Sequence, residues 1–334
     1  MRETKRRVFC LAGIIIIFSM IFALMGCTKP ATEEKKVTVS TKKDTFVVAI
    51  PTYPGFAIPF IAEKMGFFKD QKVVLKRIDD PAVINSGMIK GEIDGSFTST
   101  DSFVLAASQG VNAKAILLAD ESHGADGIVV KKKIASINDL KGKKVALNIG
   151  WPGHFFLLYN LDKAGMSPSD VTIVNMDADK AGAAFVSGKL DAAVTWEPWL
   201  SKAQEYSGGK VLVSTKDIRG IIIDPLIVSS DTIQKFPGSV QAFVKGYFDA
   251  YNWYLNNKTE GNKIMADALG LKTEEFEAMI SNSMLLGSAE NKQMLQPGGD
   301  IEKLFNKAAD LWLAAKVIDK KPTVEKPVTA EFIP

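Results

Sequence analysis

The stretch LDAAVTWEPWL, residues 190–200, begins as a short buried strand and runs directly into two tryptophans, a glutamate and a proline. Its first half, DAAVT, is small and apolar, which is typical of a strand inside a parallel sheet. Trp196, Glu197 and Trp199 stand where the strand ends and a helix begins. Because ligands of open α/β sheets bind beyond the carboxyl ends of the strands, this position favours a ligand-facing role.

The order of residues that leads into this stretch occurs twice. GEIDGSFT (91–98) and GKLDAAVT (188–195) share glycine, a charged residue, an aliphatic residue, aspartate, three strand residues and threonine. Each follows an amphipathic segment and precedes a polar loop that opens the next helix. Chance can produce such an echo in an α/β chain. The alternative, which we favour, is two similar α/β lobes with the same strand-to-helix connection.

Short apolar segments alternate with helical ones from residue 45 onward, and this alternation predicts parallel, doubly wound sheets. From Asp231 the pattern changes to amphipathic helices without strands, over 239–257, 273–284 and 299–318. The predicted strands are 45–50, 73–78, 94–98, 113–119, 126–130, 144–148, 171–176, 191–196, 211–214 and 221–228. The helices predicted between them are 58–66, 82–91, 101–108, 153–164, 178–187 and 198–206.

The N-terminus has the form of a targeting segment. A basic start is followed by an apolar run that ends in LMGC, residues 24–27. This ending resembles the lipobox of bacterial lipoproteins, with Cys27 as the lipid-carrying residue. The sequence therefore predicts a signal peptide over 1–26 and a flexible polar tether over 27–44, which place the protein on the extracytoplasmic face of the cell membrane. The alternative is an uncleaved signal anchor that stays as a membrane helix.

Charge and cysteine content exclude several function classes. The segment 1–26 carries four of the 41 basic and one of the 38 acidic residues, which leaves 37 of each. With no global basic field, nucleic-acid binding is not expected. Cys10 lies in the predicted signal peptide. The mature chain would then hold no free thiol for nucleophilic catalysis, iron–sulfur clusters or cysteine-bound zinc.

The chain resembles the solute-binding lipoproteins of bacterial ABC importers that are associated with sulfonate, taurine, nitrate and thiamine-precursor pyrimidines. The resemblance covers the chain after residue 44. It is carried by AIPTYPGFAIPFIAEKMGFF (49–68), GEIDGSFTSTD (91–101), SINDLKGKKVAL (136–147), LDAAVTWEPWL (190–200) and the lipobox.

This resemblance implies a two-lobed periplasmic-binding-protein fold of type II, the Venus-flytrap arrangement, with two crossover strands. We place the crossings near 126–130 and 221–228. The first lobe would then comprise 45–127 and 222–334, with the C-terminal helices, and the second lobe 128–221. The resemblance also implies a monomer that passes its solute to a permease with a separate ATPase. No phosphate-loop motif of its own occurs in the sequence.

The loops that follow the predicted strands supply the candidate ligand-binding residues. They combine aromatic rings, hydroxyls and carboxylates, with no lysine or arginine. Each one has a structural alternative, such as a core aromatic, a helix cap at Thr100 or a satisfied histidine at His154. The candidates are Tyr53, Phe56, Thr98, Ser99, Thr100, Asp101, Asp120, Glu121, Asp126, Trp151, His154, Trp196, Glu197 and Asp224.

A cleft of rings and carboxylates favours a small cationic or nitrogen-rich solute, such as a guanidinium, an amine or an aminopyrimidine. The competing hypothesis is an aliphatic sulfonate, taurine or nitrate. Such an anion could bind backbone N–H groups and hydroxyls at residues 98–100 and 150–154. A zwitterion such as taurine would use both kinds of group.

Two other classes remain open. A pyrimidine-synthase-like enzyme on the same fold would need reactive groups. The chain offers only His123 and His154, and no Ser-His-Asp or metal-ligand spacing. We therefore predict a binding protein without cofactor or metal. A sensor that docks to a receptor instead of a permease is the other alternative.

Overall fold

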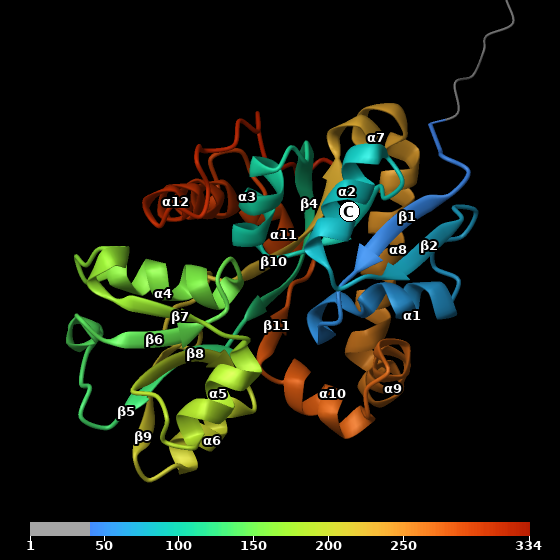
Figure 1. The fold of residues 1–334 in the computed structure, drawn as a ribbon. Coiled ribbons are helices and arrows are strands. Elements are labelled where there is room, and N and C mark those ends of the chain that lie inside the picture. Colours follow the sequence, from blue (N-terminus) through green and yellow to red (C-terminus); the bar gives the residue numbers. More distant parts are fainter. Residues whose placement is uncertain (1–40) are drawn as a thin grey trace, which may run out of the picture. The chain divides into compact units, whose positions relative to one another are not determined.

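The computed structural model describes residues 41–334, so the predicted signal peptide, Cys27 and most of the predicted tether lie outside the described residues. Two β-sheets form the centre of the described region, and helices cover their faces (Figure 1). We call the six-stranded sheet with its helices the first lobe, and the five-stranded sheet with its helices the second lobe.

The six-stranded sheet has the order β11-β4-β10-β3-β1-β2. β1 pairs in parallel with β2 and β3, whereas β10 pairs antiparallel with β3 and β4, and β11 antiparallel with β4. The predicted parallel sheet is therefore mixed. Its strands are β1 (Phe46–Ile50), β2 (Val73–Arg77), β3 (Gly95–Phe97), β4 (Ala113–Ser122), β10 (Ile223–Ser229) and β11 (Ser283–Leu285).

The five-stranded sheet has the order β7-β6-β8-β5-β9. β6 is parallel to β7 and β8, and β5 is antiparallel to β8 and β9. Asp126 and Gly127, which we predicted in the first lobe, lie in β5 of this sheet. Its strands are β5 (Asp126–Lys131), β6 (Lys144–Leu147), β7 (Thr172–Asn175), β8 (Ala192–Trp196) and β9 (Gly209–Ser214).

The helices of the first lobe come from both ends of the described region, whereas those of the second lobe are consecutive (Figure 1). The first lobe contains η1 (Pro54–Phe56), α1 (Ile58–Lys64), α2 (Pro81–Lys90), α3 (Thr100–Ser108), α7 (Ser230–Lys235), α8 (Pro237–Asn256), α9 (Lys258–Leu269), α10 (Thr273–Ile280), α11 (Ser288–Met294) and α12 (Asp300–Ala314). The second contains η2 (Ile137–Leu140), α4 (Pro152–Lys163), η3 (Pro168–Asp170), α5 (Ala178–Val186) and α6 (Trp199–Glu205).

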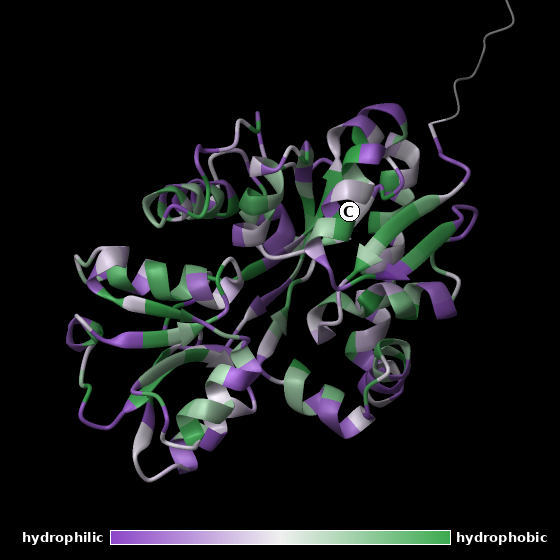
Figure 2. Ribbon diagram, viewed as in Figure 1, coloured by the Kyte–Doolittle hydropathy of each residue, from purple (hydrophilic) through white to green (hydrophobic). Residues whose placement is uncertain are grey.

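Burial of apolar side chains holds the elements together. Figure 2 shows the strands largely hydrophobic and the helices mixed, as expected for elements with one covered face. The ring of Phe68 stacks on Phe243 of α8 with centroids 5.2 Å apart, and Phe46 of β1 packs on Phe243 at 5.4 Å in a tilted arrangement. Rings that are buried and offset in this way contribute more than their area alone.

Two linkers join the lobes, residues 123–125 between β4 and β5 and residues 215–222 between β9 and β10. The strands on either side of each linker stay within one sheet, so the chain passes between the lobes directly before β5 and β10. Thr215, which is fully buried, ties the linkers together. Its hydroxyl accepts a hydrogen bond from the Gly124 amide at 2.8 Å and lies 2.9 Å from the Ser122 hydroxyl.

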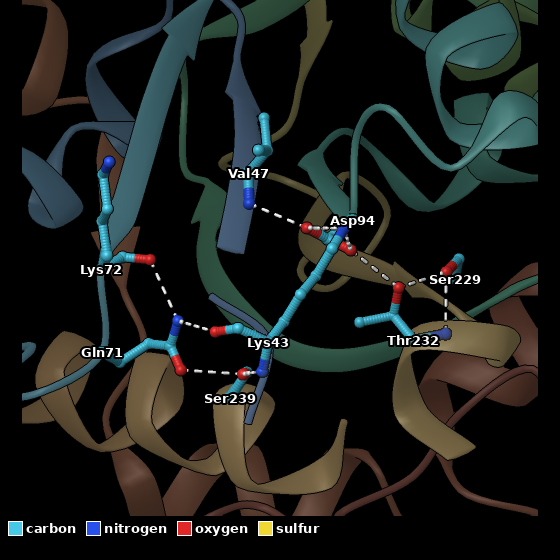
Figure 3. Close-up of polar contacts among 8 residues, drawn as sticks. All are labelled: Lys43, Val47, Gln71, Lys72, Asp94, Ser229, Thr232 and Ser239. Carbon is cyan, nitrogen blue, oxygen red and sulfur yellow. Dashed lines mark hydrogen bonds and ion pairs between the residues drawn. The ribbon is translucent and has the colours of Figure 1, made fainter. Parts of the chain in front are cut away.

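The folded body begins earlier than the predicted end of the tether at residue 44. The Lys43 amide donates to Ser239 at 2.7 Å, and its ammonium group lies 2.8 Å from the buried carboxylate of Asp94 (Figure 3). Asp94 also accepts hydrogen bonds from the Val47 amide and the Thr232 hydroxyl. A buried carboxylate is stable only with such partners, and Lys43 is therefore held against the first lobe.

The C-terminal region differs from the sequence expectation in one respect. The segment 273–284 was predicted as a single helix, but α10 ends at Ile280 and the following residues form β11 at the edge of the first sheet. Within residues 41–334, no helix has both the length and the apolar character needed to cross a membrane.

Candidate functional site

Four aspartates from different elements come together near the linkers, and we call them the carboxyl cluster: Asp101 of α3, Asp120 of β4, Asp126 of β5 and Asp224 of β10. Asp224 lies opposite Asp120 in the antiparallel pairing of β10 with β4. Residues that are opposite one another in such a pair project from the same face of the sheet. The strand register therefore places two carboxyl groups side by side.

Asp120 and Asp224 are both buried and influence one another's protonation. Asp120 is fully buried and Asp224 is 4% exposed. Burial raises the pKa of Asp120 to about 7, and a hydrogen bond with Asp224 moderates that rise. Burial and the charge of Asp120 raise the pKa of Asp224 well above its ordinary value. A hydrogen bond between two carboxyl groups needs a proton on one of them, and burial favours the pair in a form that holds this proton.

Tyr53 and Ser283 complete the surroundings of Asp120. The Tyr53 hydroxyl lies 3.2 Å from Oδ2 of Asp120 and 2.7 Å from the Ser283 hydroxyl. Burial and the nearby aspartates raise the pKa of Tyr53, so the phenol stays neutral and can donate. Oδ1 of Asp120 has no hydrogen-bond partner in the described chain.

Asp101 and Asp126 close the carboxyl cluster on its other sides. Burial raises the pKa of each to about 6. Asp101 stands in the first turn of α3, is 1% exposed, and its Oδ2 lacks a partner among residues 41–334. Asp126 accepts a hydrogen bond from Ser122 at 2.7 Å. Both charges act on Asp224, so all four groups form one electrostatic unit.

The second lobe contributes aromatic rings. Trp151 precedes α4 and is 41% exposed, and Trp196 ends β8. The indole N–H groups of Trp196 and Trp199 both donate to Oδ1 of Asp179 on α5, at 2.8 and 3.1 Å. One carboxylate thus sets the orientation of both rings.

Of the carboxyl cluster, only Asp126 borders a hollow here, which Trp151 and Trp196 of the second lobe also border. Asp126, Asn148, Trp151, Gly153 and Trp196 are among its lining residues. Its free volume is about 10 Å³, which is about the space of one water molecule. A larger solute can enter only if the walls separate, and the two linkers offer the place for that movement.

Two predicted residues, Glu121 and Glu197, make their contacts elsewhere. Glu121 receives a bidentate ion pair from Arg219 at 2.6 and 2.9 Å. Burial acts to raise its pKa, but Arg219 and the Gly220 amide outweigh this and lower it. Glu197 binds the amide and hydroxyl of Ser201 at the start of α6 and borders a separate groove with His123. Its peptide bond to Pro198 is cis.

His154 and Phe56 pack in apolar surroundings. The His154 ring lies 5.1 Å from that of Trp312 on α12, and burial lowers its pKa to about 4. It is therefore neutral at physiological pH. Phe56 packs between Tyr53 and Phe97. Neither residue lines the hollow.

The hydroxyl segment 98–100 leads into α3. Ser99 is the residue before the helix and binds Ser102, while Thr100 donates to the Ile223 carbonyl at 2.9 Å. Thr100 thus lies inside the helix and does not act as its cap. The Thr98 amide donates to the Pro225 carbonyl at 3.0 Å, so this amide is already occupied.

Four residues near the site were missed. Ser283 fell in a segment we took for helix, and Tyr247 lies in the middle of α8, so neither follows a predicted strand. Asn148 directly follows β6, and the strand-end rule would have included it. Asp179 gives no signal of its own in the sequence. Within residues 41–334, no group of three or more His, Cys, Asp or Glu side chains is arranged to hold a metal ion.

Comparison with known proteins agrees with this architecture. The family described as NMT1/THI5 like matches residues 53–260. A putative aliphatic sulfonates-binding protein of Bacillus subtilis is 27% identical over 96% of this chain and 95% of its own length. The taurine-binding periplasmic protein of Escherichia coli is 30% identical over 54% of this chain and 57% of its own length.

Among solved structures, the periplasmic aliphatic sulphonate binding protein SsuA of Escherichia coli superposes with a TM-score of 0.70. It shares 18% identity and covers 86% of this chain and 92% of its own. The predicted two-lobed periplasmic-binding-protein fold is therefore confirmed.

Proposed function

Because the chain belongs to the NMT1/THI5-like family, we propose that it is the solute-binding component of an ABC importer and captures a small solute between its lobes. The observation that carries this proposal is the hollow that Asp126 of β5 and the tryptophans border beside the two linkers. Relatives of matching length are named as binding proteins, which supports a binding role over catalysis. The described chain also contains no cysteine, and burial lowers the pKa of His154 to about 4.

A sulfonate is the first candidate solute, because the names of the relatives support it. These relatives are 27% and 30% identical and are named for aliphatic sulfonates and taurine. Their names favour the competing hypothesis from the sequence analysis, an aliphatic sulfonate or taurine, over a solute that carries only nitrogen groups. Trp151 and Gly153, at the start of α4, line the hollow, and helix starts attract anions.

A nitrogen-rich or cationic solute is the second candidate, and the carboxyl cluster favours it. Four acids lie close together, and Arg219 is bound to Glu121 instead of to any of them. A plain oxyanion would meet uncompensated negative charge here, whereas an ammonium or guanidinium group would be stabilised. Taurine, which carries both a sulfonate and an amine, satisfies both sets of observations.

Calorimetric titration with matched solutes tests the ligand class. Ethanesulfonate, taurine, ethylammonium and guanidinium differ in which charged ends they carry. The proposal expects at least one to bind the full-length protein in detergent. If no sulfonate binds, the first candidate is wrong. If none of these small solutes binds, the proposed solute class is wrong as a whole.

The location and partners form a further part of the proposal. The lipobox-like LMGC segment supports acylation of Cys27 and attachment to the extracytoplasmic face of the membrane. A lipid-anchored monomer would deliver its solute to permease subunits driven by a separate ATPase. Labelling of cells with a palmitate analogue tests the anchor, since replacement of Cys27 by alanine should abolish labelling.

A further inference from the structure

The carboxyl cluster has more hydrogen-bond acceptors than donors. Oδ1 of Asp120 and Oδ2 of Asp101 lack hydrogen-bond partners in residues 41–334, although these side chains are 0% and 1% exposed. An unpartnered buried oxygen of this kind is destabilising by roughly 1–3 kcal/mol. Two such oxygens, on carboxyl groups from different elements that both act on Asp224, indicate a group that the protein alone does not supply.

A third unpartnered group lies within electrostatic reach of Asp120. The Tyr247 hydroxyl of α8 is fully buried and has no partner in the described chain. Burial raises the pKa of Tyr247, and the charge of Asp120 raises it further, so the phenol lies within electrostatic reach of that carboxylate. Helices α3 and α8 and strand β4 thus each present an unsatisfied polar atom in the same part of the first lobe.

The chemistry of these atoms selects their partner. Carboxylates accept hydrogen bonds, and an ammonium group has three donors and a guanidinium five. A sulfonate has only acceptors and would leave Asp120 and Asp101 unsatisfied. The absence of a three-ligand metal arrangement within residues 41–334 makes a resident divalent ion a poor match.

We infer that Asp101, Asp120 and Asp224 form the seat of a protonated nitrogen of the solute, and that seating this group displaces a proton held between Asp120 and Asp224. This inference rests on the proposed function, because it assigns the polar end of the same solute. The exchange balances in charge: one solute cation enters and one proton leaves to solvent. The rings of Trp151 and Trp196 would then meet the rest of the solute.

The surroundings of the shared proton are acidic or neutral on most sides. Asp101 acts on the pair from α3, Asp126 from β5, Tyr53 from the position before η1 and Tyr247 from α8, with Ser283 on β11. The nearby cation, Arg219, is held by Glu121, and His154 of α4 is neutral. Since protons compete with the solute, affinity should increase with pH, by up to about tenfold per unit below the pKa of the pair.

Taurine and ethanesulfonate provide the central test because they differ only in the amine. We expect taurine to bind the full-length protein in detergent at least about tenfold more tightly than ethanesulfonate, a difference of about 1.4 kcal/mol. Guanidinium or ethylammonium should compete with taurine. Titration in buffers of different ionisation enthalpy should show release of up to about one proton per solute.

Two variants locate the seat. Asp120→Asn and Asp224→Asn should each weaken amine binding at least about tenfold. Both should fold, with a melting temperature equal to or above that of the wild type. Asp191→Asn, which removes an exposed ion pair with Lys131 in the second lobe, is the matched control and should bind normally.

Several outcomes would overturn the inference. Equal binding of ethanesulfonate and taurine would do so while leaving a sulfonate function intact. Unchanged amine affinity in both folded variants, tighter binding of Mg²⁺ or Ca²⁺ than of any amine, or no amine or guanidinium binding at millimolar concentration would also do so. Binding of guanidinium without any sulfonate would support the seat and reject the sulfonate candidate.

Discussion

The two sides of the linker region, which we call its walls, are built differently. The first lobe contributes carboxyl groups that are almost fully buried and held by strand register and by α3, as at Asp120 and Asp224. The second lobe contributes rings such as Trp151, which is 41% exposed. Charge therefore lies where the backbone is fixed from several sides, and apolar contact area lies at the surface. A buried charge needs fixed partners to be selective, whereas a ring face tolerates adjustment.

The largest expected effect comes from removing charge on the first wall. The double variant Asp120→Asn with Asp224→Asn should weaken binding of an amine-bearing solute by about 3–5 kcal/mol, since two buried acceptors lose their charge together. Isothermal titration measures it. A loss smaller than about tenfold, or 1.4 kcal/mol, would show that the carboxyl cluster is structural and not part of the binding surface.

Removing a ring from the second wall should have a smaller effect. Trp196→Ala should weaken binding by about 1–3 kcal/mol and leave the melting temperature of the free protein nearly unchanged. Trp253→Phe on α8 is the control, because Trp253 does not line the hollow. If Trp196→Ala lowers the melting temperature strongly and leaves the affinity intact, the ring belongs to the core of its lobe.

The pH dependence of the free energy of unfolding tests the carboxyl groups in the absence of any ligand. The pKa values of Asp101, Asp120 and Asp126 are raised to about 6, 7 and 6, so the folded state holds more protons than the unfolded state between about pH 4 and 7. The free energy of unfolding should therefore fall as pH rises through this window, by about 1–3 kcal/mol.

Urea unfolding at pH 5, 6.5 and 8 measures this change. The acids of lowered pKa, such as Glu121 and Asp191, are already ionised in both states over this range, so they do not obscure it. Asp120→Asn should flatten the profile and stabilise the free protein at pH 8 by about 1–2 kcal/mol. A stability that increases from pH 5 to 8 would contradict the raised pKa values.

The smallest expected effect comes from changing Asp179, which holds the indole rings of Trp196 and Trp199 through hydrogen bonds. Asp179→Asn keeps an acceptor for the indoles of Trp196 and Trp199 but removes its charge. Affinity should decline by about 0.5–1.5 kcal/mol, the difference between a charge-assisted and a neutral hydrogen bond. Tryptophan fluorescence anisotropy of the free protein should decrease slightly. A loss as large as that of the Asp120 variant would mean that Asp179 contacts the solute.

Sequence patterns predicted most of the fold because its strands are short, apolar and regularly alternated with helices. The echo at 91–98 and 188–195 has a structural basis, since Gly91 and Gly188 both have positive φ, and Asp94 and Asp191 both pair with a lysine. Strand direction escaped prediction, because hydrophobicity alone does not distinguish parallel from antiparallel pairing. β11 escaped because three residues are too few to give a period.

The site was predictable only in part. The acidic residues at strand ends were found from their position in the sequence. Whether such a residue joins the carboxyl cluster, as Asp120 does, or pairs with Arg219, as Glu121 does, depends on which side of β4 it occupies. That assignment needs the register of β4 with β10. Tyr247 and Asp179 lie within helices, and their roles arise from packing between elements distant in sequence.

The shared acceptor at Asp179 has a consequence for chemical selectivity. Both indole N–H groups of Trp196 and Trp199 are already donated to it, so these rings have no hydrogen bond left to offer a guest. What they present is π-electron density alone, which repels an oxyanion and tolerates methylene groups or a delocalised cation. Any sulfonate oxygen must therefore find its donors in other groups, such as backbone amides, hydroxyls or the side-chain amide of Asn148. Trp196 and Trp199 then discriminate by shape and polarity instead of by proton donation.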